Sequence, residues 1–155
     1  MKQLLLTFIL LFSACSVTDY KHTQTKVIII KSPLIKFADV GYIRNSGDSI
    51  SLELFTAGQR VQEITINHLI CVSDGCMSKS GFNKDYLHSE YPDDILQNIL
   101  LARPIFDGEA VVKIEDGFEQ KIERENINIT YRVTSDVTYF KDRKNRIIVK
   151  IKDIK

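Results

Sequence analysis

Apolar and polar side chains alternate along several short segments, and this alternation constrains the fold more than any other feature of the sequence. Ile50, Leu52 and Leu54 are separated by polar residues, and similar spacing recurs at 64–70 and 127–133. Successive side chains of a β-strand point to opposite faces of a sheet, so each of these segments is predicted to be a strand with one buried face.

Turn residues separate the predicted strands, as expected for strands that follow one another in an antiparallel sheet. Glycine stands next to aspartate at 46–48, 107–108 and 116–117, and such pairs are typical of tight turns. The further predicted strands are 27–30, 34–43, 110–114, 137–140 and 146–151. The last two of these are predicted to form a hairpin across residues 141–145.

The middle of the chain has helical spacing. Residues 92–94 read Pro-Asp-Asp, and proline and acidic residues are favoured in the first turn of a helix. The apolar residues within 95–100 then share one helical face, and Pro104 ends the helix. A shorter helical turn, capped by Asn83, is predicted at 83–88. The predicted class is α+β: mostly antiparallel β with about seven or eight strands, and one or two helices in the middle of the chain.

The start of the chain has the layout of a secretory signal. Lys2 supplies a positive charge, the apolar run 4–12 follows, and two small residues then precede Cys15. The run is shorter than the ~20 apolar residues that a helix needs to cross a bilayer, which favours a cleaved signal over a membrane span. The alternatives are an ordinary signal peptide with a coincidental cysteine and a buried apolar helix.

Phe12-Ser13-Ala14-Cys15 resembles the lipobox of bacterial lipoproteins, in which leucine and two small residues precede the cysteine. In that family the cysteine sulfur receives diacylglycerol, and the new amino terminus is usually acylated as well. This agrees with the need for two hydrophobic signals in stable anchoring. Ser16, after the cysteine, favours the periplasmic face of the outer membrane, with the inner membrane and the cell surface as the other locations.

The domain organisation follows from this processing and from the polarity of the next residues. Residues 16–25 are polar and lack hydrophobic periodicity, as in a flexible tether. We therefore expect a signal peptide at 1–14, lipidated Cys15 with its tether at 15–25, and a single globular domain at 26–155.

Cys71 and Cys76 enclose the sequence Val-Ser-Asp-Gly, which favours a tight turn. In the oxidising compartment that the signal implies, the two cysteines are predicted to form a disulfide that closes a short loop. Their spacing differs from the C-x-x-C of redox sites. The alternative is a zinc site with His68 and His88, with which oxidation after export competes.

Charge and motifs restrict the function classes. The chain has 21 basic and 20 acidic side chains, and loss of residues 1–14 removes only Lys2, so the mature part is neutral. Nucleic-acid-binding proteins usually have a basic excess, so no nucleic-acid partner is predicted. The sequence has no G-x-S-x-G, no H-E-x-x-H and no glycine-rich phosphate loop. We predict no catalytic residue, cofactor or metal ligand, and interpret the basic residues of 141–155 as solvated.

Phe82, Tyr86 and Tyr91 lie in an irregular segment, 78–91, beside the predicted helix. Loops on a rigid scaffold often carry function and aromatic rings often anchor interfaces, so these residues are candidate partner contacts. The alternative is that the rings cover the end of the core.

Four segments resemble those of small envelope lipoproteins of epsilonproteobacteria: C-V-S-D-G-C-M-S-K-S-G-F-N-K-D-Y-L, Y-P-D-D-I-L-Q-N-I-L, G-F-E-Q and Y-F-K-D-R-K-N-R-I-I-V-K-I-K-D. The resemblance implies only the Cys15 anchor. The leading hypothesis is a non-enzymatic binding or structural module of an envelope assembly, with the membrane and an envelope protein as partners. The alternatives are a carrier of an apolar ligand, such as lipid or lipopolysaccharide, and a hydrolase of envelope polymer.

Overall fold

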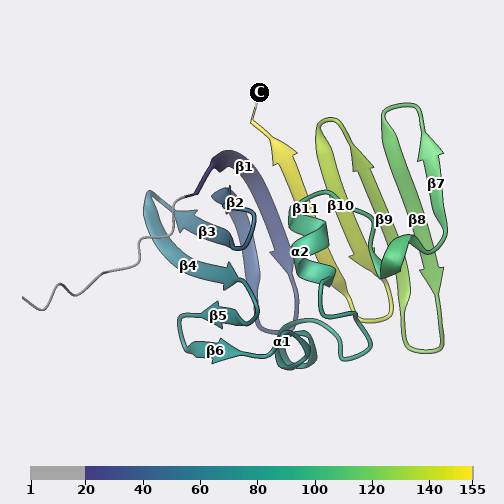
Figure 1. The fold of residues 1–155 in the computed structure, drawn as a ribbon, viewed down its shortest axis with the longest axis horizontal. Coiled ribbons are helices and arrows are strands. Elements are labelled where there is room, and N and C mark those ends of the chain that lie inside the picture. The colour runs from purple at the N-terminus through teal and green to yellow at the C-terminus, as the bar shows by residue number, and fades with distance from the viewer. Residues whose placement is uncertain (1–19, 155) are drawn as a thin grey trace, which may run out of the picture.

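The computed structural model describes residues 20–154, in which eleven strands form one antiparallel sheet (Figure 1). The order across the sheet is β6-β5-β4-β3-β2-β1-β11-β10-β9-β8-β7, so β1 lies in the middle. The strands are β1 (His22–Lys31), β2 (Lys36–Asn45), β3 (Ile50–Thr56), β4 (Gln59–Ile66), β5 (Ile70–Val72), β6 (Gly75–Met77), β7 (Val111–Ile114), β8 (Gly117–Glu123), β9 (Asn128–Thr134), β10 (Val137–Asp142) and β11 (Ile147–Asp153).

Two meanders make up the sheet, and they meet along β1 and β11. Strands next to each other in the sheet are consecutive in the sequence, except for the pair β1 and β11. That pairing sets Ile28 opposite Ile151 and Ile30 opposite Val149, and all four side chains are buried. The two halves therefore share one continuous core.

The core lies on one face of the sheet because alternate side chains point to it. Leu52, for example, stands opposite Ile43 on one side and Ile64 on the other, and all three are buried. The helices cover this face, which we call the inner face (Figure 1). The outer face is the opposite one, to which the intervening residues such as Val27 and Ile29 point.

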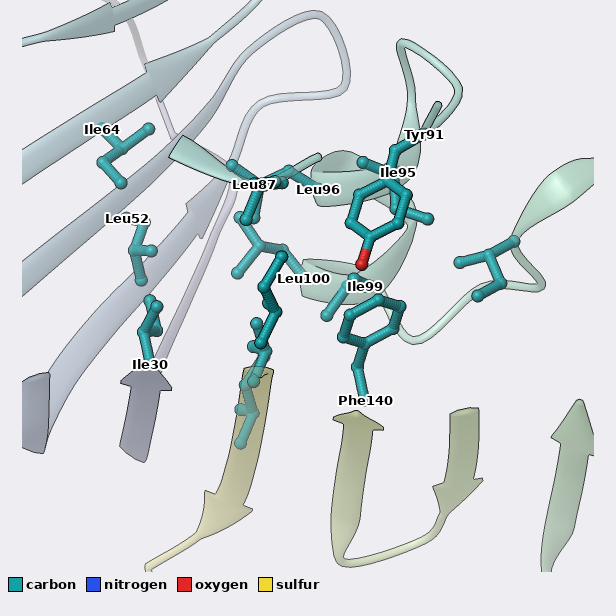
Figure 2. Packing of buried hydrophobic residues seen from close by; sticks show 14 of the residues in the cluster. Ile30, Leu52, Ile64, Leu87, Tyr91, Ile95, Leu96, Ile99, Leu100 and Phe140 are labelled. Atoms are coloured by element: carbon teal, nitrogen blue, oxygen red, sulfur yellow. The ribbon is translucent and has the colours of Figure 1, made fainter. Parts of the chain in front are cut away.

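Helices α1 (Lys79–Tyr86) and α2 (Ile95–Leu100) connect β6 to β7, together with the 3-10 helix η1 (Phe106–Gly108). The Ser78 side chain caps α1 by accepting a hydrogen bond from the Gly81 N–H, at 3.0 Å. A helix as short as α2 is marginal on its own, so it depends on burial of its apolar face, worth about 1.5–3 kcal/mol per large side chain. Those side chains are buried against the sheet (Figure 2): Ile95, Leu96, Ile99 and Leu100.

The eleven strands correct the prediction of about seven or eight, and the fold is a β-sheet with two small helices. The predicted segment 64–70 covers parts of two strands, β4 and β5. β5 and β6 have three residues each, too few for alternation to show. β8 was missed because Gln120 occupies one of its buried positions.

Three predicted boundaries also differ from the structure. α1 starts at Lys79 and is capped by Ser78, whereas the sequence predicted a turn capped by Asn83, which lies inside the helix. α2 starts at Ile95, later than the predicted Pro92. β1 starts at His22, so the last residues of the range expected as a tether, 15–25, belong to the sheet.

The predicted disulfide between Cys71 and Cys76 is confirmed. The two residues lie directly opposite each other in the hairpin of β5 and β6. Their sulfurs are bonded to each other, so they are not free thiolates for the alternative zinc site with His68 and His88.

Asp142 is a fully buried carboxylate that joins separate parts of the chain. Its Oδ2 accepts hydrogen bonds from Tyr91 Oη and Asn145 Nδ2, each at 2.7 Å. Its Oδ1 accepts from the backbone N–H groups of Asn128 and Lys144, at 3.1 and 3.0 Å. Burial by itself would raise the pKa of Asp142, but the hydrogen bonds from Asn145, Tyr91 and backbone N–H groups outweigh it and lower the pKa.

Asp142→Asn is expected to lower the free energy of unfolding at pH 7 by about 1.5–3 kcal/mol, the range for hydrogen bonds to charged groups. A carboxyl pKa that is lower in the folded chain stabilises the fold above the unfolded pKa of ~3.9, and this contribution is lost as the pH falls through the folded value. The difference between variant and wild type in urea denaturation should therefore shrink below about pH 4. Asp116→Asn, in an exposed turn, is the control. Equal losses in the two variants would contradict the assignment.

Replacement of both Cys71 and Cys76 by serine should lower the free energy of unfolding by roughly 2 kcal/mol, the chain-entropy value for so short a loop. Denaturant titrations with and without reductant measure the effect. Reduction should bring the wild type to the value of the double variant and leave that variant unchanged. A wild type that is equally stable after full reduction would show that the disulfide does not support the fold.

Candidate functional site

A pocket of about 350 Å³ opens at one end of the sheet, beside the C-terminal end of α2. The start of β1, the end of β2, the end of β11 and the turn between β9 and β10 surround it. This is the end of the sheet at which the C-terminus is labelled in Figure 1. The pocket thus lies where the two meanders meet.

The apolar part of the lining comes from three different elements. Ile43 lies on β2, Leu100 on α2 and Ile151 on β11, and all three also belong to the hydrophobic core. Leu101, half-buried at the end of α2, adds to this surface. The pocket is therefore continuous with the core on one side.

The polar part of the lining comes mainly from the central strands. Lys26 of β1 and Asp153 of β11 are opposite each other in the register and form an ion pair at the pocket. His22 and Asn45 are likewise opposite each other on β1 and β2. A charged pair and further hydrogen-bonding groups, with Asp136 among them, therefore stand beside an apolar surface.

The pocket exists because the chain turns away from the sheet directly after α2. Ala102 has a positive φ of 53°, and the Arg103 N–H donates back to the Asn98 carbonyl at 2.8 Å. Tyr131 Oη on β9 donates to the Arg103 carbonyl at 2.9 Å, which holds this turn in place. The end of the sheet beyond Leu100 is left without a covering helix.

The lining suits non-covalent binding of an amphipathic molecule. Pockets that bind small ligands usually have about 300–1,000 Å³ and mostly apolar walls. This pocket has such a volume, and nine of its fifteen lining residues are polar, so it offers both kinds of surface. Among residues 20–154, no three His, Cys, Asp or Glu side chains are grouped as metal ligands. In the same part of the chain, no helix has the length and apolar character needed to cross a membrane.

The residues predicted from the sequence as sites do not line this pocket. Cys15 and the expected signal peptide lie outside the described residues, and Cys71 and Cys76 are on the distant β5–β6 hairpin.

Of the candidate partner contacts, Phe82 and Tyr91 are buried and belong to the core, which agrees with the alternative interpretation of this segment. Tyr86 is half-buried and stacks on Phe82, with ring centroids 4.6 Å apart.

Sequence reasoning missed the pocket because its residues are scattered over five segments of the chain. The expected tether includes His22, and the sequence predicts no role for Asp153. The one usable signal was the charge of Lys26 and Asp153 next to strands rich in isoleucine.

Comparison of the chain with protein-family models, with curated proteins and with solved structures gave no match.

Proposed function

We propose that this chain is a lipid-anchored carrier of the cell envelope, which holds an amphipathic ligand such as a lipid in the pocket beside α2. The observation that carries the proposal is the composition of that pocket. An apolar surface made by Ile43, Leu100 and Ile151 stands beside the ion pair of Lys26 and Asp153. Its volume of about 350 Å³ is within the range of small-ligand pockets.

The two kinds of lining define how the ligand binds. Its apolar end lies against Leu100 and the core, where transfer from water contributes about 25 cal/mol per Å² of buried apolar surface. Its polar end meets the ion pair, where Lys26 offers a donor to phosphate or carboxylate and Asp153 accepts from an amine or hydroxyl.

The position of the pocket relative to the proposed anchor supports a role at the membrane. His22 lines the pocket, and Cys15 precedes it by seven positions. A fully extended chain spans at most about 3.3–3.6 Å per residue, so the pocket lies within roughly 25 Å of a lipid on Cys15. A ligand that leaves the membrane therefore has a short path to the pocket.

Gln24→Trp should reduce the ligand bound by the full chain about tenfold, because Gln24 is an exposed residue of the lining and an indole there fills the opening. The measurement is native mass spectrometry of protein purified from membranes, which separates non-covalent lipid from the covalent anchor. Gln59→Trp, at an exposed position of β4, is the matched control. Equal lipid in wild type and Gln24→Trp, or none in either, would refute the carrier.

A second candidate function is the docking of an envelope protein at β7, and a specific observation favours it. β7 is an edge of the sheet, and within residues 20–154 no strand pairs with its other side. Val112 is 62% exposed and Val111 37% exposed. An open edge with apolar side chains accepts an added strand from a partner.

Val112→Asp should reduce the capture of such a partner by about tenfold, since a charge in the contact removes apolar burial and adds desolvation. In-cell cross-linking followed by mass spectrometry measures the capture. Val61→Asp is the matched control, because Val61 is 54% exposed on β4, away from the β7 edge. Equal loss in the two variants would place the partner elsewhere.

A further inference from the structure

The outer face of strands β2, β1, β11, β10 and β9 has a one-sided charge distribution, bounded by Glu53 on β3 and Glu119 on β8. In β2, β1, β11, β10 and β9, the acidic residues are Asp39, Asp142 and Asp153, and the register places all three on the inner face. Every lysine and arginine of these strands except Lys26 points to the outer face. Six of them form the surface that we call the basic face: Lys31, Lys36, Arg132, Lys141, Lys150 and Lys152.

The register places these cations in rows across the sheet. Lys31 stands opposite Lys36 on one side and Ile148 on the other, and Ile148 stands opposite Lys141. In the next row, Lys150 stands between Ile29 and Tyr139, and Tyr139 stands opposite Arg132. Adjacent strands are about 4.7–4.9 Å apart, so these cations lie close to one another on one surface.

The cations of the basic face form no ion pair in the described part of the chain, although Arg132 stands opposite Glu119 of β8. Among residues 20–154, none of the six makes an ion pair with a carboxylate. Like charges directly opposite each other, as Lys31 and Lys36 are, destabilise a sheet. A bound anion at this surface removes that repulsion.

Apolar side chains lie between the cations. Val27, Ile29, Tyr139 and Ile148 point to the outer face and are half-buried. Lysine stems lie along apolar surface while their amines reach water, which is how basic surfaces meet the boundary between lipid headgroups and acyl chains. The helices are on the opposite face of the sheet, so the basic face is not covered by them (Figure 1).

We propose that the basic face docks onto a membrane surface through the phosphate groups of anionic phospholipids. The inference rests on the lipid anchor of the proposed function, since the first described residue follows Cys15 by five positions and the domain is thereby held at the membrane. The mixture of cations with isoleucine and tyrosine over five strands fits a lipid surface better than a hydrated polymer, which has no apolar layer to meet these side chains.

The test follows the acylation of lysine amines in the full chain, reconstituted into vesicles of phosphatidylcholine alone or of phosphatidylcholine with phosphatidylglycerol. Flotation first shows that the chain is anchored in both. Lys141 and Lys150 should then react several-fold more slowly on the anionic vesicles, as measured by mass spectrometry of peptides. Lys84, exposed on α1, is the internal reference and should react equally on both. About 1 M salt, where the screening length is about 3 Å, should abolish the difference.

Variants test the charge itself. Lys150→Glu with Lys152→Glu should reduce the protection of Lys31 and Lys141 by about tenfold or more, because each lysine near an anionic surface contributes a factor of roughly five. Lys84→Glu with Lys113→Glu makes the same charge change away from the basic face and should leave the protection unchanged. Equal thermal unfolding of the two double variants shows that the fold is kept.

Three results would overturn the proposal. Equal acylation of Lys141 on both kinds of vesicle, with the chain afloat in both, would show that the basic face does not dock. Protection by soluble polyphosphate but not by phosphatidylglycerol would assign the face to an anionic polymer. A chain that does not float would contradict the anchor on which the inference rests. The absence of a lipid cargo in the pocket would refute the carrier and leave the acylation result intact.

Discussion

The antiparallel pairing of β1 with β11 is the interaction on which the rest of the structure depends. It joins two meanders that would otherwise be separate sheets, each with an additional open edge. It makes the inner face continuous by setting Ile28 against Ile151, and it places Lys26 beside Asp153 at the pocket. On the outer face the same pairing aligns Ile29 with Lys150. The core, the pocket and the basic face therefore all follow from one register.

Sequence periodicity predicted the strands in which burial in the core is the only requirement on the type of residue at the inner-face positions. Segments such as 50–54 and 127–133 are strands because their inner-face positions are apolar. It failed at β8, where the buried Gln120 is satisfied by the backbone of Ile105, its side chain accepting at 2.8 Å and donating at 2.9 Å. It misplaced α1 because that helix depends on the cap at Ser78 and on the burial of Phe82, and not on an extended apolar stripe.

The candidate site could not be predicted from the sequence, for a different reason. Lys26 and Asp153 are 127 positions apart, and nothing in the sequence near either residue indicates that the two form a pair. From the sequence, the basic residues of 141–155 are expected to be solvated, because a linear pattern does not show which face of a sheet a side chain occupies. Only the pairing of strands shows that the aspartates of β2, β10 and β11 point to the inner face, while the lysines of β1, β2, β10 and β11, except Lys26, point to the outer face. The disulfide was predictable because its two cysteines lie on one hairpin.

The central pairing also has a kinetic consequence. β1 is the first strand in the sequence and β11 the last, so β1 gains hydrogen bonds along its second edge only after the whole chain is available. Contacts between residues so distant in sequence have high contact order and form slowly. The pairing of β1 with β11 is therefore expected to form later than the local hairpins on either side of it.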